Sequence, residues 1–313
     1  MPGAYAHLTL VNSLRQPLEL EAVTHMPKAA IRALLKHFKY CELGAVSPDY
    51  PYLALNDRQQ AKSWADKMHY QHSGEMLKAG VRHLACSEGE ERDKGLAWLL
   101  GYCAHVITDV TVHPVIEMKV GPYKENADAH RHCEMHQDAY IYPKLNLGAI
   151  GLSEHLDSGI AACCDATGQK LDPVIEKLWD NCFKDVYIEE WASNPPAIND
   201  WHKGFITVVD KIAEEGNRLL PFARHLGVKF AVLYPNQEQI EKTYLTLATP
   251  EGDMHYDAIF LRARENVKHF WQLIASGVLE QDSAYLESIK DWNLDTGRDA
   301  AGKLAFWQEL TPT

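Results

Sequence analysis

The residues with the clearest chemical meaning are the histidines, which are concentrated in the first half of the chain. Eleven of the sixteen histidines lie within residues 1–140. Three histidines within thirty consecutive residues are each followed, four positions later, by a carboxylate. The pairs are His105/Asp109, His113/Glu117 and His130/Glu134. Residues four apart on a helix project from the same face, so the spacing predicts helices that present ligating side chains in rows.

Two such rows lie next to each other in the sequence. One contains His105, Asp109 and His113, and the other contains His130, Glu134 and Asp138. Imidazole nitrogens and carboxylate oxygens are ordinary zinc ligands, and zinc with an open coordination position activates water for hydrolysis. Facing helices of a bundle form multinuclear sites of this kind. The apolar surroundings of Asp109 favour a metal partner, because a buried carboxylate without a partner is costly.

Five short motifs together resemble a known family. In chain order they are GAYAHLTL with His7, GAVSPDYPY with Asp49, KMHY with His69, GYCAHVITDVTVHP with His105, Asp109 and His113, and AHRHCEMHQD with His130 and Glu134. Over residues 3–140 this series resembles the zinc-dependent phospholipase C family, whose relatives include the S1/P1-type nucleases and the N-terminal domain of glycosylphosphatidylinositol phospholipase D. The resemblance implies an all-α phospholipase C/P1 nuclease-like bundle with two or three zinc ions.

The resemblance also implies a role for each matching residue. One zinc would be held by Asp49, His69, His105 and Asp109, a second by His113, His130 and Glu134, and a third by His7 with a bridging Asp109. Asp49 is also the family's candidate general base for the attacking water. The third site is expected to be filled least, because secreted relatives close it with a processed amino terminus and no signal peptide is visible here.

Other interpretations of single residues stay open at this stage. His72 lies one turn after His69 and is its rival as a ligand. Asp49 follows a proline and fits a turn residue that bonds to nearby amides. Glu117 is a weaker candidate ligand, because a helix ending at Pro114 would separate it from its row. The histidines beside the second row, at positions 132 and 136, are expected to lie off its ligand face.

The ligand rows require helices, and helical patterning covers nearly the whole chain. Apolar periodicity predicts helices over 27–40, 57–85, 92–113, 127–140 and 256–276. Asp57 fits an N-cap, and Pro114 is expected to end the third helix. The strand candidates are 4–11 and 229–234. A break within 191–200 predicts a metal-binding catalytic domain over 1–190 and a helical extension packed on it over 191–313.

Composition excludes several classes of protein. The net charge of −12 argues against a stable nucleic-acid complex, which needs lysine and arginine to neutralise phosphates. No run of about 18 apolar residues is apparent, so no transmembrane anchoring is expected. The seven cysteines form no CxxC pair, so we expect reduced thiols and a cytoplasmic protein. The oligomeric state is left open.

These observations favour zinc-dependent hydrolysis of a phosphate ester, with a phospholipid as a candidate substrate. An S1/P1-type nuclease is the alternative within the enzyme class. A non-catalytic helical scaffold that keeps a structural zinc is the alternative outside it. The number of candidate ligands weighs against the scaffold, because a closed structural zinc site needs four ligands and eight are present.

Overall fold

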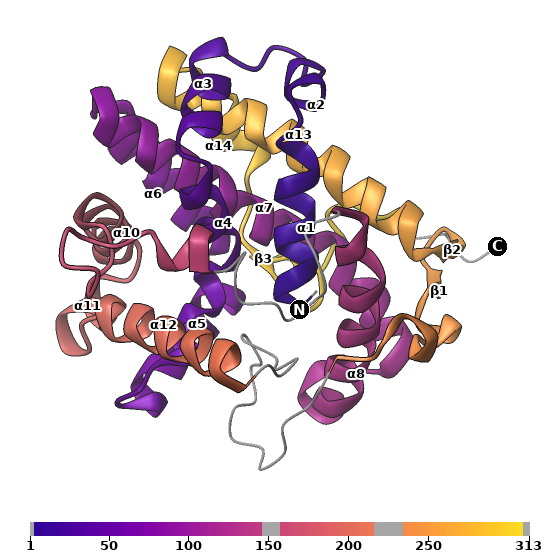
Figure 1. Cartoon of the computed structure of the whole chain (residues 1–313). Helices are drawn as coiled ribbons and strands as arrows, with labels where there is room; N and C mark the ends of the chain where they lie inside the picture. Colours follow the sequence, from indigo (N-terminus) through magenta and orange to yellow (C-terminus); the bar gives the residue numbers. More distant parts are fainter. Residues whose placement is uncertain (1–2, 146–156, 216–233, 309–313) are drawn as a thin grey trace.

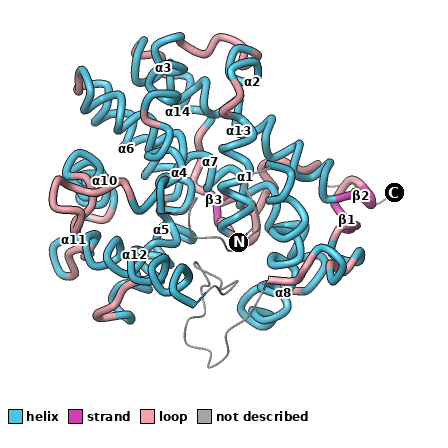
Figure 2. The backbone as a smooth tube through the Cα atoms, viewed as in Figure 1, coloured by secondary structure: helices cyan, strands magenta, loops and turns pink. Residues whose placement is uncertain are grey.

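Helices make up most of the described structure and the strands are short, which confirms the all-α fold class (Figures 1 and 2). The computed structural model describes residues 3–145, 157–215 and 234–308. In chain order the helices before residue 146 are α1 (Ala4–Leu14), α2 (Pro17–Glu21), α3 (Lys28–Lys36), α4 (Phe38–Val46), η1 (Ser47–Leu53), α5 (Arg58–Tyr70), α6 (Ser73–Ala85), α7 (Gly89–Val120), α8 (Tyr123–Ile141) and η2 (Tyr142–Leu145).

The remaining helices and four short strands follow the first gap. They are η3 (Asp157–Ala161), α10 (Pro173–Val186), α11 (Ile188–Ser193), α12 (Ile198–Glu215), η4 (Gln237–Gln239), η5 (Lys242–Tyr244), β1 (Thr246–Thr249), β2 (Gly252–His255), α13 (Tyr256–Glu280), α14 (Ala284–Ser288), β3 (Trp292–Asn293) and β4 (Arg298–Asp299). The strands form two antiparallel pairs, β1 with β2 and β3 with β4. The helix predicted over 256–276 from apolar periodicity is confirmed, because α13 covers these residues.

The central element is α7, which packs most extensively against α4 and α13. Its middle turns are buried on every side, as expected for an apolar helix inside a bundle. Two glycines let α4 and α7 approach closely. A Cβ on Gly44 would lie 2.0 Å from the Trp98 carbonyl oxygen, and one on Gly101 would lie 2.0 Å from that of Cys41. This close contact places the row of His105, Asp109 and His113 deep inside the molecule.

The length and hydropathy of α7 would also suit a membrane span, which the sequence analysis did not anticipate. Its most apolar 18-residue window has a mean hydropathy of 1.3 and is 100% buried within the structure. Complete burial by other helices is typical of a core helix in a globular bundle. Within the described residues this is the one helix that meets both criteria.

Three helix predictions were wrong at their boundaries. The helix predicted over 57–85 is two helices, α5 and α6, because His72 adopts a positive φ of 55° between them. Asp57 nevertheless caps α5, since its side chain accepts a hydrogen bond from the Gln60 amide. The segment 27–40 also breaks, at His37, where φ is −118° and ψ is 30°.

The third correction concerns Pro114, which does not end its helix. Instead, α7 continues to Val120. Proline removes one helical hydrogen bond, but the following residues Val115 and Ile116 are completely buried, and this packing holds the next turn in place. Glu117 consequently lies on the same helix as His113, one turn further on, and the argument that separated it from its row was wrong.

The strand predicted over 4–11 was also wrong, because these residues lie in α1. Every residue from Ala4 to Val11 is buried, and a short, fully buried apolar run has no periodicity that separates strand from helix. The other strand candidate, 229–234, lies outside the described residues except for Tyr234.

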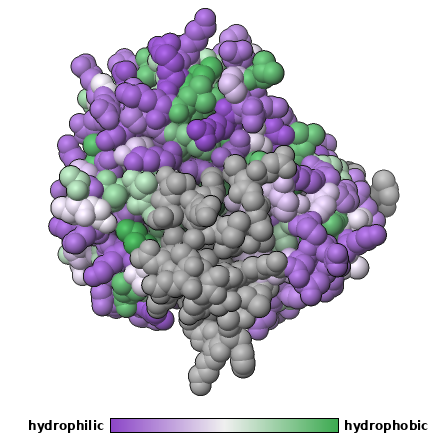
Figure 3. All heavy atoms as spheres, in the orientation of Figure 1, coloured by the Kyte–Doolittle hydropathy of each residue, from purple (hydrophilic) through white to green (hydrophobic). Residues whose placement is uncertain are grey.

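The later helices pack directly on the earlier ones. Helical structure is interrupted between α11 and α12, where a domain boundary was expected. However, α12 packs on η1, and α13 packs on α7. The division of the chain at residue 190 stays a prediction. Hydrophilic residues dominate the described atoms on the face drawn in Figure 3, and the hydrophobic patches there are small.

Candidate metal centre

The first buried cluster joins α1 to α7. His7 Nε2 lies 3.2 Å from one carboxylate oxygen of Asp109, and His105 Nε2 lies 3.3 Å from the other. The two imidazole rings stack with centroids 4.1 Å apart. The ligating atoms of the three residues all lie within 4.8 Å of one another. The carboxylate of Asp109 is thus shared between the two histidines, and its role as a bridge between two zinc ions stays a prediction.

A second cluster shares His105 with the first. It adds Asp49 from η1 and His69 from α5, with His69 Nε2 3.4 Å from Asp49 Oδ1. All of these side chains are buried. The structure therefore brings together Asp49, His69 and His105 from three separate elements, and His105 links them to Asp109, the fourth residue that the family resemblance assigns to one zinc. His72, the rival of His69, is on the outside and faces Asp291.

Backbone carbonyls fix the orientation of four predicted ligands. In each case one ring nitrogen lies within hydrogen-bond distance of a carbonyl oxygen, so that nitrogen carries the proton and the other can bind a metal. The pairs are His69 Nδ1 with Ala65 at 2.7 Å, His105 Nδ1 with Ala45 at 2.9 Å, His113 Nδ1 with Leu294 at 2.6 Å and His130 Nε2 with Gly121 at 2.7 Å.

The first cluster contains polar atoms that the described protein does not satisfy. Both nitrogens of His7, the Nε2 of His105 and both oxygens of Asp109 are buried and have no hydrogen-bond partner among the described residues. Each unsatisfied buried polar group costs roughly 1–3 kcal/mol, and more when it is charged. Metal coordination would satisfy one nitrogen of His7, the Nε2 of His105 and the oxygens of Asp109, and imidazole with carboxylate is a suitable donor set for zinc. The residues present therefore fit the metal.

The pKa shifts of His7 and Asp109 in this cluster favour the binding of a cation. Burial and the neighbouring His105 lower the pKa of His7, which favours the neutral imidazole that metals bind. Burial raises the pKa of Asp109, but His105 and His113 more than offset this and hold it well below its usual range. Burial also lowers the pKa of His105, yet Asp109 raises it overall. A proton on His105 would thus compete with a metal for Asp109.

The predicted ligands of another zinc are placed less compactly. His113 is buried on α7, one turn beyond Asp109, and His130 is buried on α8. Glu134 is half-buried, one turn after His130. Among the described residues these three do not form a group as tight as the two clusters above. Their role as ligands stays a prediction.

A third histidine cluster lies outside this arrangement. His132 and His136 contact Glu241 near η5, with their Nε2 atoms 3.2 Å apart. The Glu241 amide donates to Nδ1 of His136 at 3.0 Å, so the ring proton of neutral His136 sits on Nε2. A metal at Nε2 would need that proton moved. Both side chains lie off the predicted ligand face, as expected, and attach the later chain to α8.

Several supporting residues were missed or only partly anticipated from the sequence. Asp138, the third residue of its row, accepts a hydrogen bond from the Ala6 amide at 2.8 Å. It therefore holds the first turn of α1, which carries His7. The hydroxyl oxygen of Tyr50, the residue after Asp49, lies 3.1 Å from Nδ1 of His202 on α12. Only the place of Asp138 in its row gave a sequence signal.

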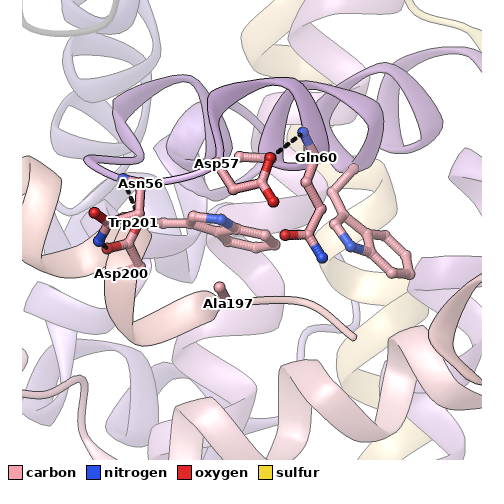
Figure 4. Close-up of a pocket in the computed structure, with 8 residues that line it drawn as sticks. Asn56, Asp57, Gln60, Ala197, Asp200 and Trp201 are labelled. Atoms are coloured by element: carbon pink, nitrogen blue, oxygen red, sulfur yellow. Dashed lines mark hydrogen bonds between the residues drawn. The ribbon is translucent and has the colours of Figure 1, made fainter. Parts of the chain in front are cut away.

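A separate pocket of about 250 Å³ lies between the start of α5 and the start of α12 (Figure 4). Asn56 donates two hydrogen bonds to Asp200 at one side of it, and Asp57 turns toward Gln60. None of the predicted ligands lines this pocket. Its polar contacts attach α12 to the loop before α5.

Comparison with protein families identifies the chain. The family described as zinc dependent phospholipase C matches residues 6–191. The chain belongs to the zinc-dependent phospholipase C family. The match includes every ligand predicted for this family member, from His7 to Glu134. Comparison with curated proteins and with solved structures finds no match. The seven cysteines are all free thiols in the structure.

Proposed function

We propose that this chain is a zinc-dependent phosphodiesterase that hydrolyses a phosphate ester, as in a phospholipase C. The proposal is supported by the family match over residues 6–191 and by the buried cluster of His7, His105 and Asp109. That cluster has five polar atoms without hydrogen-bond partners among the described residues. Burying such atoms in a bundle core costs free energy, and a bound cation would offset that cost.

The ligand sets follow the family resemblance. Asp49, His69, His105 and Asp109 would hold one zinc, His113, His130 and Glu134 a second, and His7 with Asp109 a third. Bound zinc lowers the pKa of a coordinated water towards 7 and neutralises negative charge on phosphoryl oxygens.

The chain's own residues would act in three ways. The Asp49 carboxylate, beside His69 at 3.4 Å, orients the attacking water and accepts its proton. The carbonyls of Ala45 and Ala65 hold His105 and His69 in the tautomer that ligates through Nε2. Asp109, whose pKa is depressed, remains an anion with one oxygen beside His7 and the other beside His105. Fixed dipoles and charges of this kind stabilise the transition state without reorganising during the reaction.

The negative net charge of −12 favours a phospholipid or small phosphate ester over nucleic acid, because nucleic-acid binding draws on cationic side chains. The test is a substrate panel of phosphatidylcholine vesicles, bis-p-nitrophenyl phosphate and single-stranded DNA, assayed before and after metal removal. Chelator-sensitive hydrolysis of either non-nucleic substrate, restored by zinc, is expected. Hydrolysis confined to DNA would favour an S1/P1-type nuclease. No hydrolysis by zinc-loaded protein would favour a scaffold.

A further inference from the structure

The segment that carries β3 and β4 reaches two predicted zinc ligands through the backbone of a single residue, Leu294. The Leu294 amide donates to the backbone carbonyl of His69 at 2.8 Å. The Leu294 carbonyl accepts a hydrogen bond from Nδ1 of His113 at 2.6 Å. Leu294 therefore joins α5 to α7 at two ligand positions, and it lies beyond the residues that match the family, which end at 191.

The next residue places a carboxylate beside the same histidine. Asp295 Oδ1 lies 3.8 Å from Nδ1 of His113, and Asp295 Oδ2 accepts a hydrogen bond from the Tyr70 hydroxyl at 2.8 Å. The Asp295 amide is itself held by the side chain of Asn293 at 3.0 Å. A carbonyl and a carboxylate on the proton-bearing side of an imidazole fix its tautomer and raise the basicity of the other nitrogen.

The segment is fixed to the helices on both sides of Leu294. Ser73 and Trp292 exchange two hydrogen bonds, at 2.8 and 2.9 Å, at the junction of α5 and α6. Asp291 accepts from the first amides of α6, which is a favourable place for an anion. β3 contacts both α5 and α6, and its residue Trp292 is buried.

A glycine permits the closest approach to α7. Gly297 has φ of 65°, and a Cβ there would lie 2.3 Å from Pro114 Cγ and 2.5 Å from the Val110 carbonyl oxygen. Pro114 has no amide hydrogen to bond to that carbonyl. The segment thus packs at the point where α7 lacks one backbone hydrogen bond, directly after His113.

We propose that residues 292–297 are a positioning element of the metal centre. The Leu294 carbonyl and the Asp295 carboxylate hold the His113 ring in ligating orientation, and the Leu294 amide holds the backbone of His69, without binding metal themselves. This inference rests on the proposed function, in that His69 and His113 are zinc ligands. It assigns to the C-terminal part of the chain a specific contribution to zinc affinity, in addition to packing.

The test compares two glycine variants on either side of β4. Gly297→Ala introduces a Cβ against α7, whereas Gly302→Ala introduces one where nothing lies within 4 Å. Both glycines have positive φ, 65° and 77°, so both variants carry a similar backbone strain. Zinc affinity is measured by chelator competition, and geometry by the visible spectrum of Co²⁺-substituted protein. Gly297→Ala is expected to weaken zinc binding roughly 10- to 100-fold and to alter the spectrum, with Gly302→Ala unchanged.

A second pair covers the case in which Gly297→Ala does not fold. Asp295→Asn removes the charge beside His113. Asp299→Asn makes the same change in the same hairpin, where the Asp299 side chain bonds only to the amides of Ala301 and Lys303 among the described residues. Asp295→Asn is expected to weaken zinc binding roughly 10-fold and to shift the Co²⁺ spectrum, whereas Asp299→Asn is expected to leave both unchanged.

The outcomes separate this inference from the proposed function. Wild-type zinc affinity in folded Gly297→Ala and Asp295→Asn would overturn the positioning role and leave the proposed function standing. Weakened binding in these variants, with wild-type protein that binds zinc but hydrolyses no substrate, would support the positioning role and contradict the proposed function. Wild-type protein that binds no zinc would overturn both.

Discussion

Asp109 is the side chain on which the buried clusters most depend. Its carboxylate oxygens lie within about 3.3 Å of His7 Nε2 on α1 and of His105 Nε2 on its own helix. The charge of His113, one turn away, also lowers the pKa of Asp109. Since it is completely buried, its negative charge has to be balanced inside the protein. The histidines balance it in part, and bound cations would complete the balance.

Replacing Asp109 by asparagine tests this role. Asp109→Asn keeps the shape but removes the charge and one ligating oxygen, so it should lose more than one zinc equivalent. Hydrolysis should fall by more than the roughly 10- to 100-fold typical of supporting residues. His132→Ala, a change on the outer face of α8, should be nearly silent in both measurements. Similar metal content in the two variants would show that the ligand face of the site is assigned wrongly.

His202 is expected to make stability depend on pH. Burial lowers its pKa from 6.5 to about 4, so below pH 6.5 the unfolded chain binds a proton that the folded chain does not. The free energy of unfolding should therefore fall as pH decreases from about 6.5 to about 4, by about 3 kcal/mol. The free energy of unfolding in urea, plotted against pH, should therefore differ between wild type and His202→Gln over this range. The comparison isolates His202 because the contribution of bound metal is common to both proteins. Parallel profiles would argue that His202 is accessible to protons in the folded state.

At the scale of elements, the site depends on how closely α4, η1, α5 and α7 approach one another. Asp49 lies on η1, which follows α4 directly, and the Ala45 carbonyl on α4 holds His105. The spacing of α4 and α7 therefore sets both the position of Asp49 and the orientation of His105. Gly44 and Gly101 define that spacing.

Gly101→Ala tests the close contact between α4 and α7, because the contact reverses the sign of the expected change in the free energy of unfolding. Alanine in place of a glycine inside a helix normally stabilises by about 0.5–1 kcal/mol. Here the added Cβ would meet the Cys41 carbonyl oxygen at 2.0 Å, so the variant should instead lose about 1–3 kcal/mol in chemical unfolding. An increase in stability would show that α4 and α7 are not packed this closely.

Elements and ligands differed in how far sequence could predict them. His105, Asp109 and His113 share one helix, so local spacing was enough to place them in a row. The meeting of Asp49 with His69 depends on tertiary packing and was expected only from the family resemblance. The segment at 4–11 was mistaken for a strand because it is buried on all sides. Leu294 acts through its backbone, which no side-chain pattern reveals.

At the scale of the whole molecule, the metal centre joins elements from most of the chain. Predicted ligands lie on α1, η1, α5, α7 and α8, and the C-terminal segment contacts two of them. Metal bound at this position would link helices that are far apart in sequence. A ligand that binds only the folded state raises stability by mass action.

Removing zinc should accordingly lower thermal stability. One site at a zinc concentration 100 times its Kd contributes about 2.7 kcal/mol, and each kcal/mol shifts the Tm of a chain of this length by about 1.5 °C. Two sites should therefore give a difference of roughly 8 °C between loaded and chelated protein in calorimetry. His132→Ala should keep this difference and Asp109→Asn should lose most of it. Equal Tm values for loaded and chelated wild-type protein would contradict the structural role of the metal.

The most direct test of the central claim is the zinc content of the purified, zinc-loaded chain after removal of excess metal. Elemental analysis against protein concentration from amino-acid analysis gives this number without any assumption about substrate. The buried clusters around Asp109 predict two or three zinc equivalents per chain. Less than one equivalent after loading would contradict the account.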